Sequence, residues 1–200
     1  MKPIFIENFF PEEILKVTYS YLVMKTAATK EFTHEPSSNT IASYYADSLC
    51  ETLLDMSTPV VEQNVNKKLY PTYSFARIYD KGSHLPIHVD RGSCEYTVAI
   101  CIGSQPSDVP YSIHIGKQNK NSTYHYVNQE NEEVKLEIEH TFAMSTNNAL
   151  IFQGLENLHW REKCVHDHFI TVFLHYVDKE GEFTAHKYDG RELLGISDRK

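Results

Sequence analysis

The feature that most constrains the fold of this 200-residue chain is a change of hydrophobic period near Tyr70. Before this residue, apolar side chains recur at helical spacing, whereas beyond it they alternate with polar ones as in half-buried strands. The sequence therefore predicts one domain with a helical lead-in over 1–69, a β core over 70–178 and a C-terminal extension over 179–200.

Two segments of the lead-in are predicted to be helical. Residues 11–25 open with Pro11 and two glutamates, which suit the positive end of a helix, and continue with apolar residues at helical spacing: Ile14, Val17, Tyr21 and Met24. Residues 43–56 show a similar pattern, and Thr58 with Pro59 is typical of the start of a further helix.

Short segments with period-two alternation fill the β core, separated by turns rich in Gly, Pro, Asn and Asp. In "TYSFARIY" the alternation places Tyr73, Phe75, Arg77 and Tyr79 on one face. The other predicted strands cover 95–103, 111–116, 132–139, 148–152 and 168–177. Many short strands behind a helical lead-in predict a mainly β fold, a barrel or jelly roll buttressed by helices.

Charge and cysteine usage exclude several function classes. The net charge is -8 and no cluster of Lys and Arg is visible, which argues against nucleic acid as a partner. The four cysteines form no CxxC pair, so neither a zinc knuckle nor a thioredoxin motif is indicated. The apolar run at the N-terminus is too short for a signal peptide, and none is long enough to span a membrane. We therefore expect a cytoplasmic protein with no membrane partner; the oligomeric state stays open.

His88 and Asp90 form a His-x-Asp pair within "HLPIHVDRGSCEYTVAI". Residues two apart on a strand point the same way, so both side chains can face one metal ion. Two histidines and one carboxylate suit non-haem Fe(II) and leave positions open for further ligands. With 11 histidines in the chain such a pair can arise by chance, so its weight comes from the flanking strands and the turn at Gly82.

A third ligand must come from a distant strand, and His159 is the preferred choice. It follows a predicted strand and turn in "NALIFQGLENLHWRE". The pair His166 and His168 competes with it. Three further histidines lie in predicted strands, where packing is the commoner explanation for a histidine: His114, His125 and His175.

The segments "PTYSFARIYDKGSHLPIHVDRGSCEYTVAI", "NALIFQGLENLHWRE" and "ITVFLHYVD" together resemble the Fe(II)- and 2-oxoglutarate-dependent oxygenases. The resemblance is to the prolyl-4-hydroxylase-like branch, which includes small bacterial and phage members. It covers Tyr70 to Asp178, and "FIENFFPEEI" adds to it.

This resemblance implies a double-stranded β-helix, also called a jelly roll or cupin-like fold, with helices on one side. It implies Fe(II) held by His88, Asp90 and His159, with 2-oxoglutarate chelating the iron and O2 as oxidant. The implied reaction is hydroxylation of an unactivated C–H bond, coupled to decarboxylation of 2-oxoglutarate to succinate. The implied substrate is a small molecule, peptide or protein, with a prolyl or other amino-acid group as the target.

The chain departs from the family pattern where the second carboxylate of 2-oxoglutarate should bind. The family places a Lys or Arg beyond the distal histidine, but "HFITVF" contains neither. Arg161 is the predicted substitute, since an extended backbone would direct it inward beside His159 and a guanidinium can bind a carboxylate through two hydrogen bonds. A surface salt bridge with Glu162 is the alternative. Arg77 is the second choice, and the resemblance assigns the Tyr79 hydroxyl to the same carboxylate.

Other functions remain open on the sequence alone. The main alternative is a cupin-like metal-binding protein or isomerase without 2-oxoglutarate chemistry, and a demethylase of nucleic-acid bases is disfavoured by the acidic charge. Trp160 could line the pocket or pack beneath its strand. The segments "EFTHEPSSNT" and "IGKQNKNSTYHYVNQENEE" are either lids that contact substrate or solvated loops.

Overall fold

The computed structural model describes residues 1–29, 39–118, 124–127 and 133–195. Two α-helices and two 3-10 helices are present among them: α1 (Glu12–Ala28), α2 (Ser48–Val65), η1 (Gly92–Cys94) and η2 (Thr184–Gly190). The strands are β1 (Ile4–Ile6), β2 (Ala42–Tyr45), β3 (Leu69–Tyr79), β4 (Leu85–His88), β5 (Tyr96–Gln105), β6 (Tyr111–Gln118), β7 (Tyr124–Val127), β8 (Glu133–Met144), β9 (Ala149–Phe152), β10 (Leu158–Arg161) and β11 (His168–Asp178).

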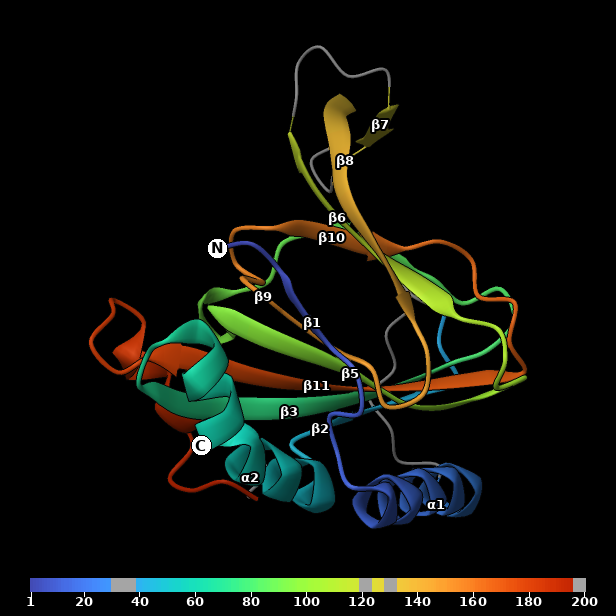
Figure 1. Cartoon of the computed structure of the whole chain (residues 1–200), viewed down its shortest axis with the longest axis horizontal. Helices are drawn as coiled ribbons and strands as arrows, with labels where there is room; N and C mark the ends of the chain where they lie inside the picture. The colour runs from blue at the N-terminus through green and yellow to red at the C-terminus, as the bar shows by residue number, and fades with distance from the viewer. Residues whose placement is uncertain (30–38, 119–123, 128–132, 196–200) are drawn as a thin grey trace.

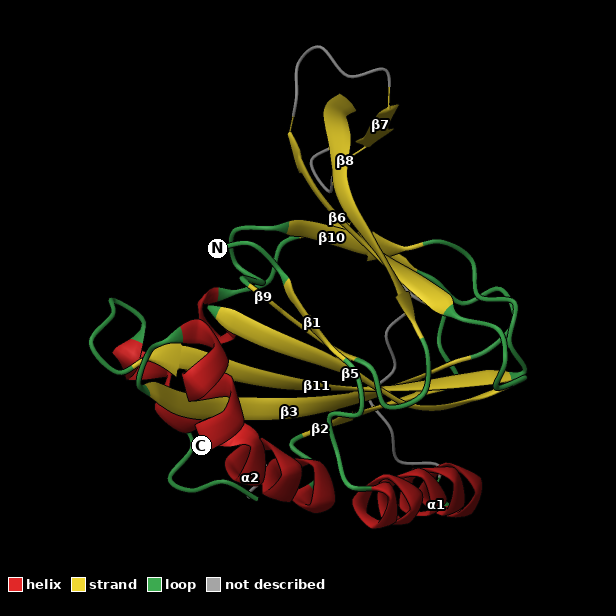
Figure 2. Cartoon of the chain, in the orientation of Figure 1, coloured by secondary structure: helices red, strands yellow, loops and turns green. Residues whose placement is uncertain are grey.

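The strands form two antiparallel sheets (Figure 1). The larger has six strands in the order β1-β9-β5-β11-β3-β2, and the smaller has five in the order β4-β10-β6-β8-β7. Both helices lie on the side of the larger sheet that faces away from the smaller one (Figure 2). The prediction of a mainly β fold buttressed by N-terminal helices is therefore confirmed.

Three hydrophobic clusters join these layers. The first lies between the helices and the larger sheet, and includes Leu22 of α1, Leu54 of α2 and Val172 of β11. The second lies between the two sheets and includes Ile113 of β6 and Phe169 of β11. A small third cluster of Leu136, Leu158 and Trp160 packs on the smaller sheet. Because the central strands are covered on both faces, β11 is buried almost throughout.

Two of the four apolar residues predicted to form the buried face of the first helix are exposed instead. Val17 and Met24 are 59% and 69% exposed, whereas Thr18 and Leu22 are fully buried. The Thr18 hydroxyl can be buried because it donates to the Ile14 carbonyl oxygen at 2.8 Å. Apolar residues occur around most of α1, so the contact with the sheet, rather than the local period, selects the buried face.

The second helix begins later than predicted. The Asp47 carboxylate caps it by accepting from the backbone N–H groups of Leu49 and Cys50 at 3.0 and 3.2 Å. The residues just before this cap, Ala42–Tyr45, form β2 and pair with β3. The aromatic pair in "SYYADS" therefore belongs to an edge strand, and the lead-in is not purely helical.

The prediction of a separate helix starting at Thr58 and Pro59 is also wrong. Helix α2 continues through Pro59, although a proline inside a helix removes one backbone hydrogen bond. Leu54 and Val61 lie on either side of the proline and are both fully buried in the first cluster. Their packing against the sheet keeps the two halves in one helix.

Two short strands, β1 and β2, were not predicted, and three others, β4, β7 and β10, were expected only from the placing of His88, His125 and His159 on strands and not from alternation. Each has three or four residues, which is too short for alternation to be recognised in a sequence. Two of them, β4 and β10, lie next to each other in the smaller sheet. They carry the histidines of the predicted metal site.

A buried carboxylate, Glu51, joins the helix layer to the sheet and to the C-terminal segment. Its Oε1 atom accepts from the Ser74 backbone N–H at 2.8 Å and from the Ser74 hydroxyl at 3.1 Å. Its Oε2 atom pairs with Arg191 Nη1 at 3.0 Å, and both side chains are almost fully buried. Losing either partner would leave the other charge uncompensated in the interior.

We expect Glu51→Ala to lower the free energy of unfolding by about 3–5 kcal/mol, because the buried Arg191 would lose the carboxylate of Glu51 that offsets its charge. Urea denaturation followed by circular dichroism measures this loss. Lys16→Ala is the control, since it removes an ion pair with Glu12 whose side chains are 72% and 71% exposed; its loss should be about 0.3–0.5 kcal/mol. Equal losses in the two variants would contradict the structural role of Glu51.

Candidate metal centre

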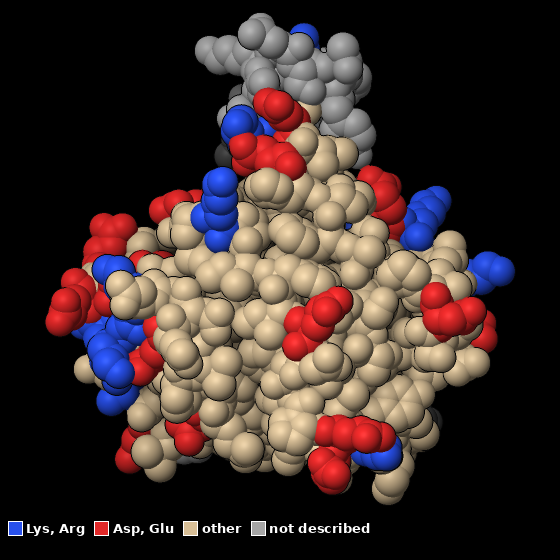
Figure 3. All heavy atoms as spheres, viewed as in Figure 1, with Lys and Arg blue, Asp and Glu red and all other residues tan. Residues whose placement is uncertain are grey.

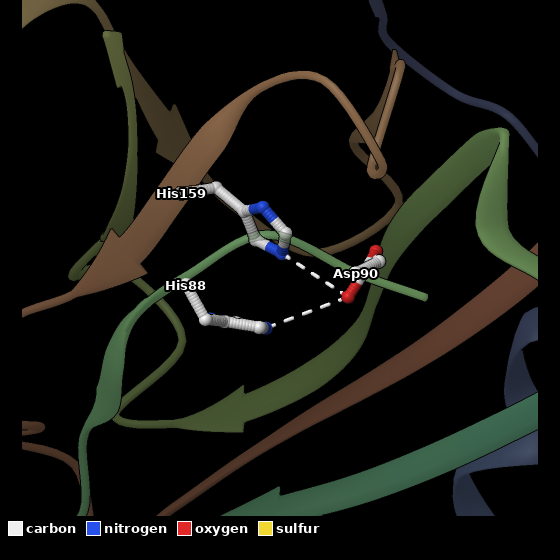
Figure 4. A group of neighbouring side chains, drawn as sticks. All are labelled: His88, Asp90 and His159. Atoms are coloured by element: carbon white, nitrogen blue, oxygen red, sulfur yellow. Dashed lines mark ion pairs between the residues drawn. The ribbon is translucent and has the colours of Figure 1, made fainter. Parts of the chain in front are cut away.

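His88, Asp90 and His159 converge on one point between two adjacent strands of the smaller sheet (Figure 4). His88 ends β4 and is the register partner of His159 in β10. The Asp90 Oδ1 atom lies 3.4 Å from His88 Nε2 and 3.6 Å from His159 Nε2. One ligand atom from each side chain lies within 4.8 Å of the other two. The structure thus brings together the three predicted ligands.

The loop after β4, rather than the strand, presents Asp90. β4 ends at His88, and Asp90 follows two residues later without strand structure. Val89 between them is 46% exposed and turns away from the site. The expectation that Asp90 would lie on a strand is therefore wrong in detail, although both side chains point to the same place.

Both imidazoles are oriented by backbone carbonyl groups. His88 Nδ1 lies 2.8 Å from the Pro86 carbonyl oxygen, and His159 Nδ1 lies 2.9 Å from that of Asn157. A carbonyl oxygen only accepts, so each Nδ1 must donate its proton. The Nε2 atoms that face Asp90 then carry the lone pairs, as metal ligation requires.

Asp90 is held by the turn after β9. Its backbone N–H donates to the Gly154 carbonyl oxygen at 2.8 Å, and its Oδ2 atom accepts from the Thr97 hydroxyl at 3.1 Å. A Cβ atom on Gly154 would overlap Asp90 Oδ2 and lie 2.5 Å from Thr97 Oγ1. Position 154 therefore has to be glycine for the carboxylate to occupy this place.

The protonation states suit a cation. Burial lowers the pKa of His159 to about 4 against the opposing effect of Asp90. For Asp90, burial raises the pKa, but the neighbouring histidines, His159 foremost, outweigh it and hold the pKa below its usual range. At neutral pH the site then offers the neutral imidazole of His159 and the carboxylate of Asp90, so a metal ion can bind without displacing protons from these two groups.

Four of the other histidines that the sequence offered lie away from this centre. His166 Nε2 contacts the Val109 carbonyl oxygen at 2.8 Å and His168 Nε2 the Tyr19 hydroxyl at 2.7 Å. His114 Nδ1 contacts the Thr141 hydroxyl at 2.9 Å, and His125 lies in β7, at the far edge of the smaller sheet. His114, His166 and His168 belong to no cluster of possible ligands among the described residues.

Arg161 lies two residues beyond His159 on β10 and is only 1% exposed. Its Nη1 atom donates to the Tyr111 carbonyl oxygen at 2.6 Å. Its Nε and Nη2 atoms are buried and have no hydrogen-bond partner among the residues that the structure describes. The guanidinium carbon lies 4.9 Å from the ring centre of Tyr111 and 5.3 Å from that of Phe169. A surface salt bridge with Glu162 is thereby excluded.

Unsatisfied N–H groups on a buried cation are costly. The two free groups of Arg161 have the fork geometry that binds a carboxylate through two hydrogen bonds. Strand geometry separates Arg161 from His159 by about 6.6 Å along β10, on the same face. This arrangement fits a short dicarboxylate with one end at the three ligands and the other end at Arg161.

Tyr79 and Arg77 lie beside this position. Tyr79 is fully buried, and its ring centre lies 5.8 Å from the guanidinium carbon of Arg161 and 5.8 Å from that of Arg77. Arg77 Nη1 donates to the Tyr79 hydroxyl oxygen at 3.4 Å. No acceptor for the hydroxyl proton of Tyr79 occurs among the residues that the structure describes, so this proton is available to a ligand. Arg77 thus contacts Tyr79 directly.

The remaining side chains near β10 have structural roles. Trp160 packs with Leu136 and Leu158 in the third cluster, beneath the strand. Lys163 is exposed, as expected for a residue outside the site. The first predicted lid, "EFTHEPSSNT", lies almost wholly outside the described residues, and the second includes two segments outside them, 119–123 and 128–132.

Two residues around the centre escaped the sequence analysis, Thr97 and Gly154, and a third, His175, was expected only to pack within its strand. Asp90, Cys94 and His175 form a second group with ligand-type atoms within 4.8 Å of one another, and burial lowers the pKa of His175 to about 4. The place of Thr97 on the inner face of β5 could have been found from strand alternation. The role of Gly154 depends on a contact with a loop 64 positions earlier, which no local pattern reveals.

Gly154→Ala should weaken binding of a divalent metal by about 10–100-fold or more, since the added methyl group displaces Asp90. Isothermal titration with Mn²⁺ under anaerobic conditions measures the affinity. Gly181→Ala is the matched control, because its Cβ would meet only the Asp178 side chain within 3.4 Å. Unchanged metal affinity in Gly154→Ala would show that Asp90 does not need this turn.

Surface features add little to the site. Figure 3 shows acidic and basic side chains scattered over the visible face, without a large patch of Lys and Arg on it. None of the helices in the described part of the chain has both the length and the apolar character needed to cross a membrane.

Comparison with known proteins identifies the fold. No protein-family model matches the sequence, and no curated protein shows a significant match. Among solved structures, a prolyl-4-hydroxylase from Pseudomonas putida aligns with a TM-score of 0.56 at 11% identity, covering 86% of this chain and 91% of that one. The non-haem α-ketoglutarate-dependent epimerase SnoN of nogalamycin biosynthesis aligns at 0.64 with 7% identity, covering 88% and 78%.

A third similar structure is HygX from Streptomyces hygroscopicus, solved with nickel and 2-oxoglutarate bound. It aligns with a TM-score of 0.60 at 13% identity, covering 89% of this chain and 83% of that one. At such identities the likeness establishes architecture rather than activity. The chain has the double-stranded β-helix fold of these 2-oxoglutarate-dependent enzymes, as the resemblance in its sequence implied.

Proposed function

We propose that this protein is an Fe(II)- and 2-oxoglutarate-dependent oxygenase. In this proposal His88, Asp90 and His159 hold Fe(II), and Arg161 with Tyr79 binds the distal carboxylate of 2-oxoglutarate. The proposed reaction is hydroxylation of an unactivated C–H bond. The whole chain, from the helices to the C-terminal segment, acts as a single domain around this site.

The observation that carries the proposal is the combination of two half-sites on one face of β10. Two Nε2 lone pairs and one carboxylate oxygen converge at His159, and a buried guanidinium with two unused N–H groups lies two residues farther on. A purely structural metal site would not need the buried guanidinium of Arg161. A site that only binds a carboxylate would not need the three metal ligands.

When bound, Fe(II) with 2-oxoglutarate and O2 supplies an oxidant for C–H bonds and releases succinate and CO2. The protein positions the metal ligands and the cosubstrate and excludes water from the site. The Pro86 and Asn157 carbonyl groups fix the imidazoles. Arg161 fixes the far end of the cosubstrate, which limits its orientations. The aromatic rings around Arg161 exclude water and strengthen its ion pair with the carboxylate.

For the prime substrate we propose a small molecule, peptide or protein. Similar structures include a prolyl hydroxylase in complex with a peptide of hypoxia-inducible factor and SnoN in complex with a nogalamycin compound. A prolyl or other amino-acid group is the first choice for screening. Because fold alone does not determine a substrate, this choice rests on analogy. We propose a cytoplasmic location, since a reducing compartment suits four buried free cysteines.

An anaerobic absorption titration tests the proposal. Adding Fe(II) and then 2-oxoglutarate to metal-free wild-type protein should produce a weak visible charge-transfer band, because the keto acid chelates the metal. His159→Ala should produce none, since one of three ligands is lost. A metal-loaded, folded wild-type protein without the band would refute the proposal and favour a cupin-like metal-binding protein or isomerase.

Arg161→Ala should raise the 2-oxoglutarate concentration needed for half of the band by about 10–100-fold, as expected for a lost bidentate ion pair of roughly 1.5–3 kcal/mol. Fe(II) affinity should change little, because Arg161 contacts none of the three ligands. Lys163→Ala, two residues farther on and exposed, is the matched control. If Arg161→Ala keeps the wild-type 2-oxoglutarate dependence, the role passes to Arg77.

A further inference from the structure

A chain of hydrogen bonds leads from Asp90 into the larger sheet. Asp90 Oδ2 lies 3.1 Å from the Thr97 hydroxyl on β5, and the same hydroxyl lies 3.1 Å from His175 Nδ1 on β11. Thr97 and His175 are direct register partners and are 1% and 5% exposed. Cross-strand partners point to the same face of a sheet, which is why both reach the same loop.

The direction of this chain is fixed by proton counting. Asp90 is a carboxylate and only accepts, so Thr97 must donate its single hydroxyl proton to Oδ2. The Thr97 oxygen then accepts, and His175 Nδ1 is the donor. The His175 ring is held in place by the Tyr73 ring at 4.5 Å and the Phe173 ring at 6.4 Å. A donor fixed in this way orients the threonine hydroxyl toward Asp90.

The two oxygens of Asp90 therefore have different environments. Oδ1 faces both histidine Nε2 atoms. Oδ2 faces Thr97 and lies against Gly154, where the absence of a Cβ atom leaves room for it. A carboxylate free to rotate can bind a metal through both oxygens and then occupies two coordination positions. A carboxylate whose Oδ2 atom is held by a hydrogen bond can offer only its Oδ1 atom to the metal.

We propose that Thr97 is a positioning residue that keeps Asp90 a one-oxygen ligand. This inference rests on the proposed function, because it concerns the coordination positions that the cosubstrate and O2 require. With Oδ2 held, the three protein ligands occupy three positions and leave the rest of an octahedral site open. His175 supports Thr97 and does not contact the metal ligands' Nε2 atoms.

The experiment compares wild type with Thr97→Val, which removes the hydroxyl and keeps the shape of the side chain. Thr97→Ser restores the hydroxyl and tests for rescue. Thr171→Val is the matched control, since Thr171 is a fully buried threonine whose hydroxyl has no hydrogen-bond partner among the described residues. Fe(II) affinity is measured anaerobically, and 2-oxoglutarate is then titrated at saturating Fe(II) with the charge-transfer band as readout.

We expect Thr97→Val to bind Fe(II) about 10–100-fold more weakly, as for other groups that orient metal ligands. At saturating Fe(II) it should also bind 2-oxoglutarate about 10-fold or more weakly, because a carboxylate bound through two oxygens competes for a position. Thr97→Ser and Thr171→Val should both match wild type. A crystal structure of Mn²⁺-loaded Thr97→Val should show both Asp90 oxygens on the metal.

The inference is overturned if Thr97→Val matches Thr171→Val in both titrations. It is also overturned if Fe(II) affinity falls while 2-oxoglutarate affinity at saturating Fe(II) is unchanged, since Thr97 would then only stabilise the site. Should Thr97→Val fail to fold, Thr97→Ala compared with Thr97→Ser gives the same two readouts. A wild-type protein that binds Fe(II) without any band refutes the proposed function, while the crystal structures still decide whether Thr97 governs the Asp90 binding mode.

Discussion

The antiparallel pairing of β4 with β10 is the interaction on which the site depends. It sets His88 directly opposite His159, although they are 71 positions apart along the chain. Each histidine is then turned by a carbonyl group two residues earlier on its own segment. The same pairing brings the loop after β4 to the turn before β10. There the Gly154 carbonyl oxygen accepts a hydrogen bond from the Asp90 backbone N–H. A shift of register by one residue would turn His159 to the opposite face.

The second consequence of this pairing is the burial of Arg161. The register of β10 against β4 is irregular between His159 and Arg161, and such irregularities are common next to active sites because they redirect side chains. Here both side chains are buried, at 2% and 1% exposure. A buried cation without a counter-charge costs stability, and the proposed carboxylate ligand would offset this cost by neutralising Arg161. The metal ligands and the cation thus form two ends of one proposed binding site.

Sequence patterns predicted the layers better than the details. The alternation in 168–177 predicted the long central strand β11, and the acidic start of 11–25 predicted α1. The spacing of apolar residues did not predict the buried face of a helix that is apolar on most sides, as Val17 and Met24 of α1 show. It also failed where tertiary packing holds a helix together across a proline, as at Pro59. The three residues of β1 and the four of β2 showed no alternation, and these strands were not predicted.

The sequence by itself determined which side chains are available: the His-x-Asp pair, the distal His159, and an arginine two residues beyond it. Side chains two residues apart on a strand point to the same side. The sequence spacing of His159 and Arg161 was therefore enough to predict that they share a face. Only the tertiary structure decided which of eleven histidines meets Asp90, and that Thr97, Gly154 and His175 surround this carboxylate. Those contacts join strands distant in sequence, and their geometry is set by sheet register and packing, which no short segment contains.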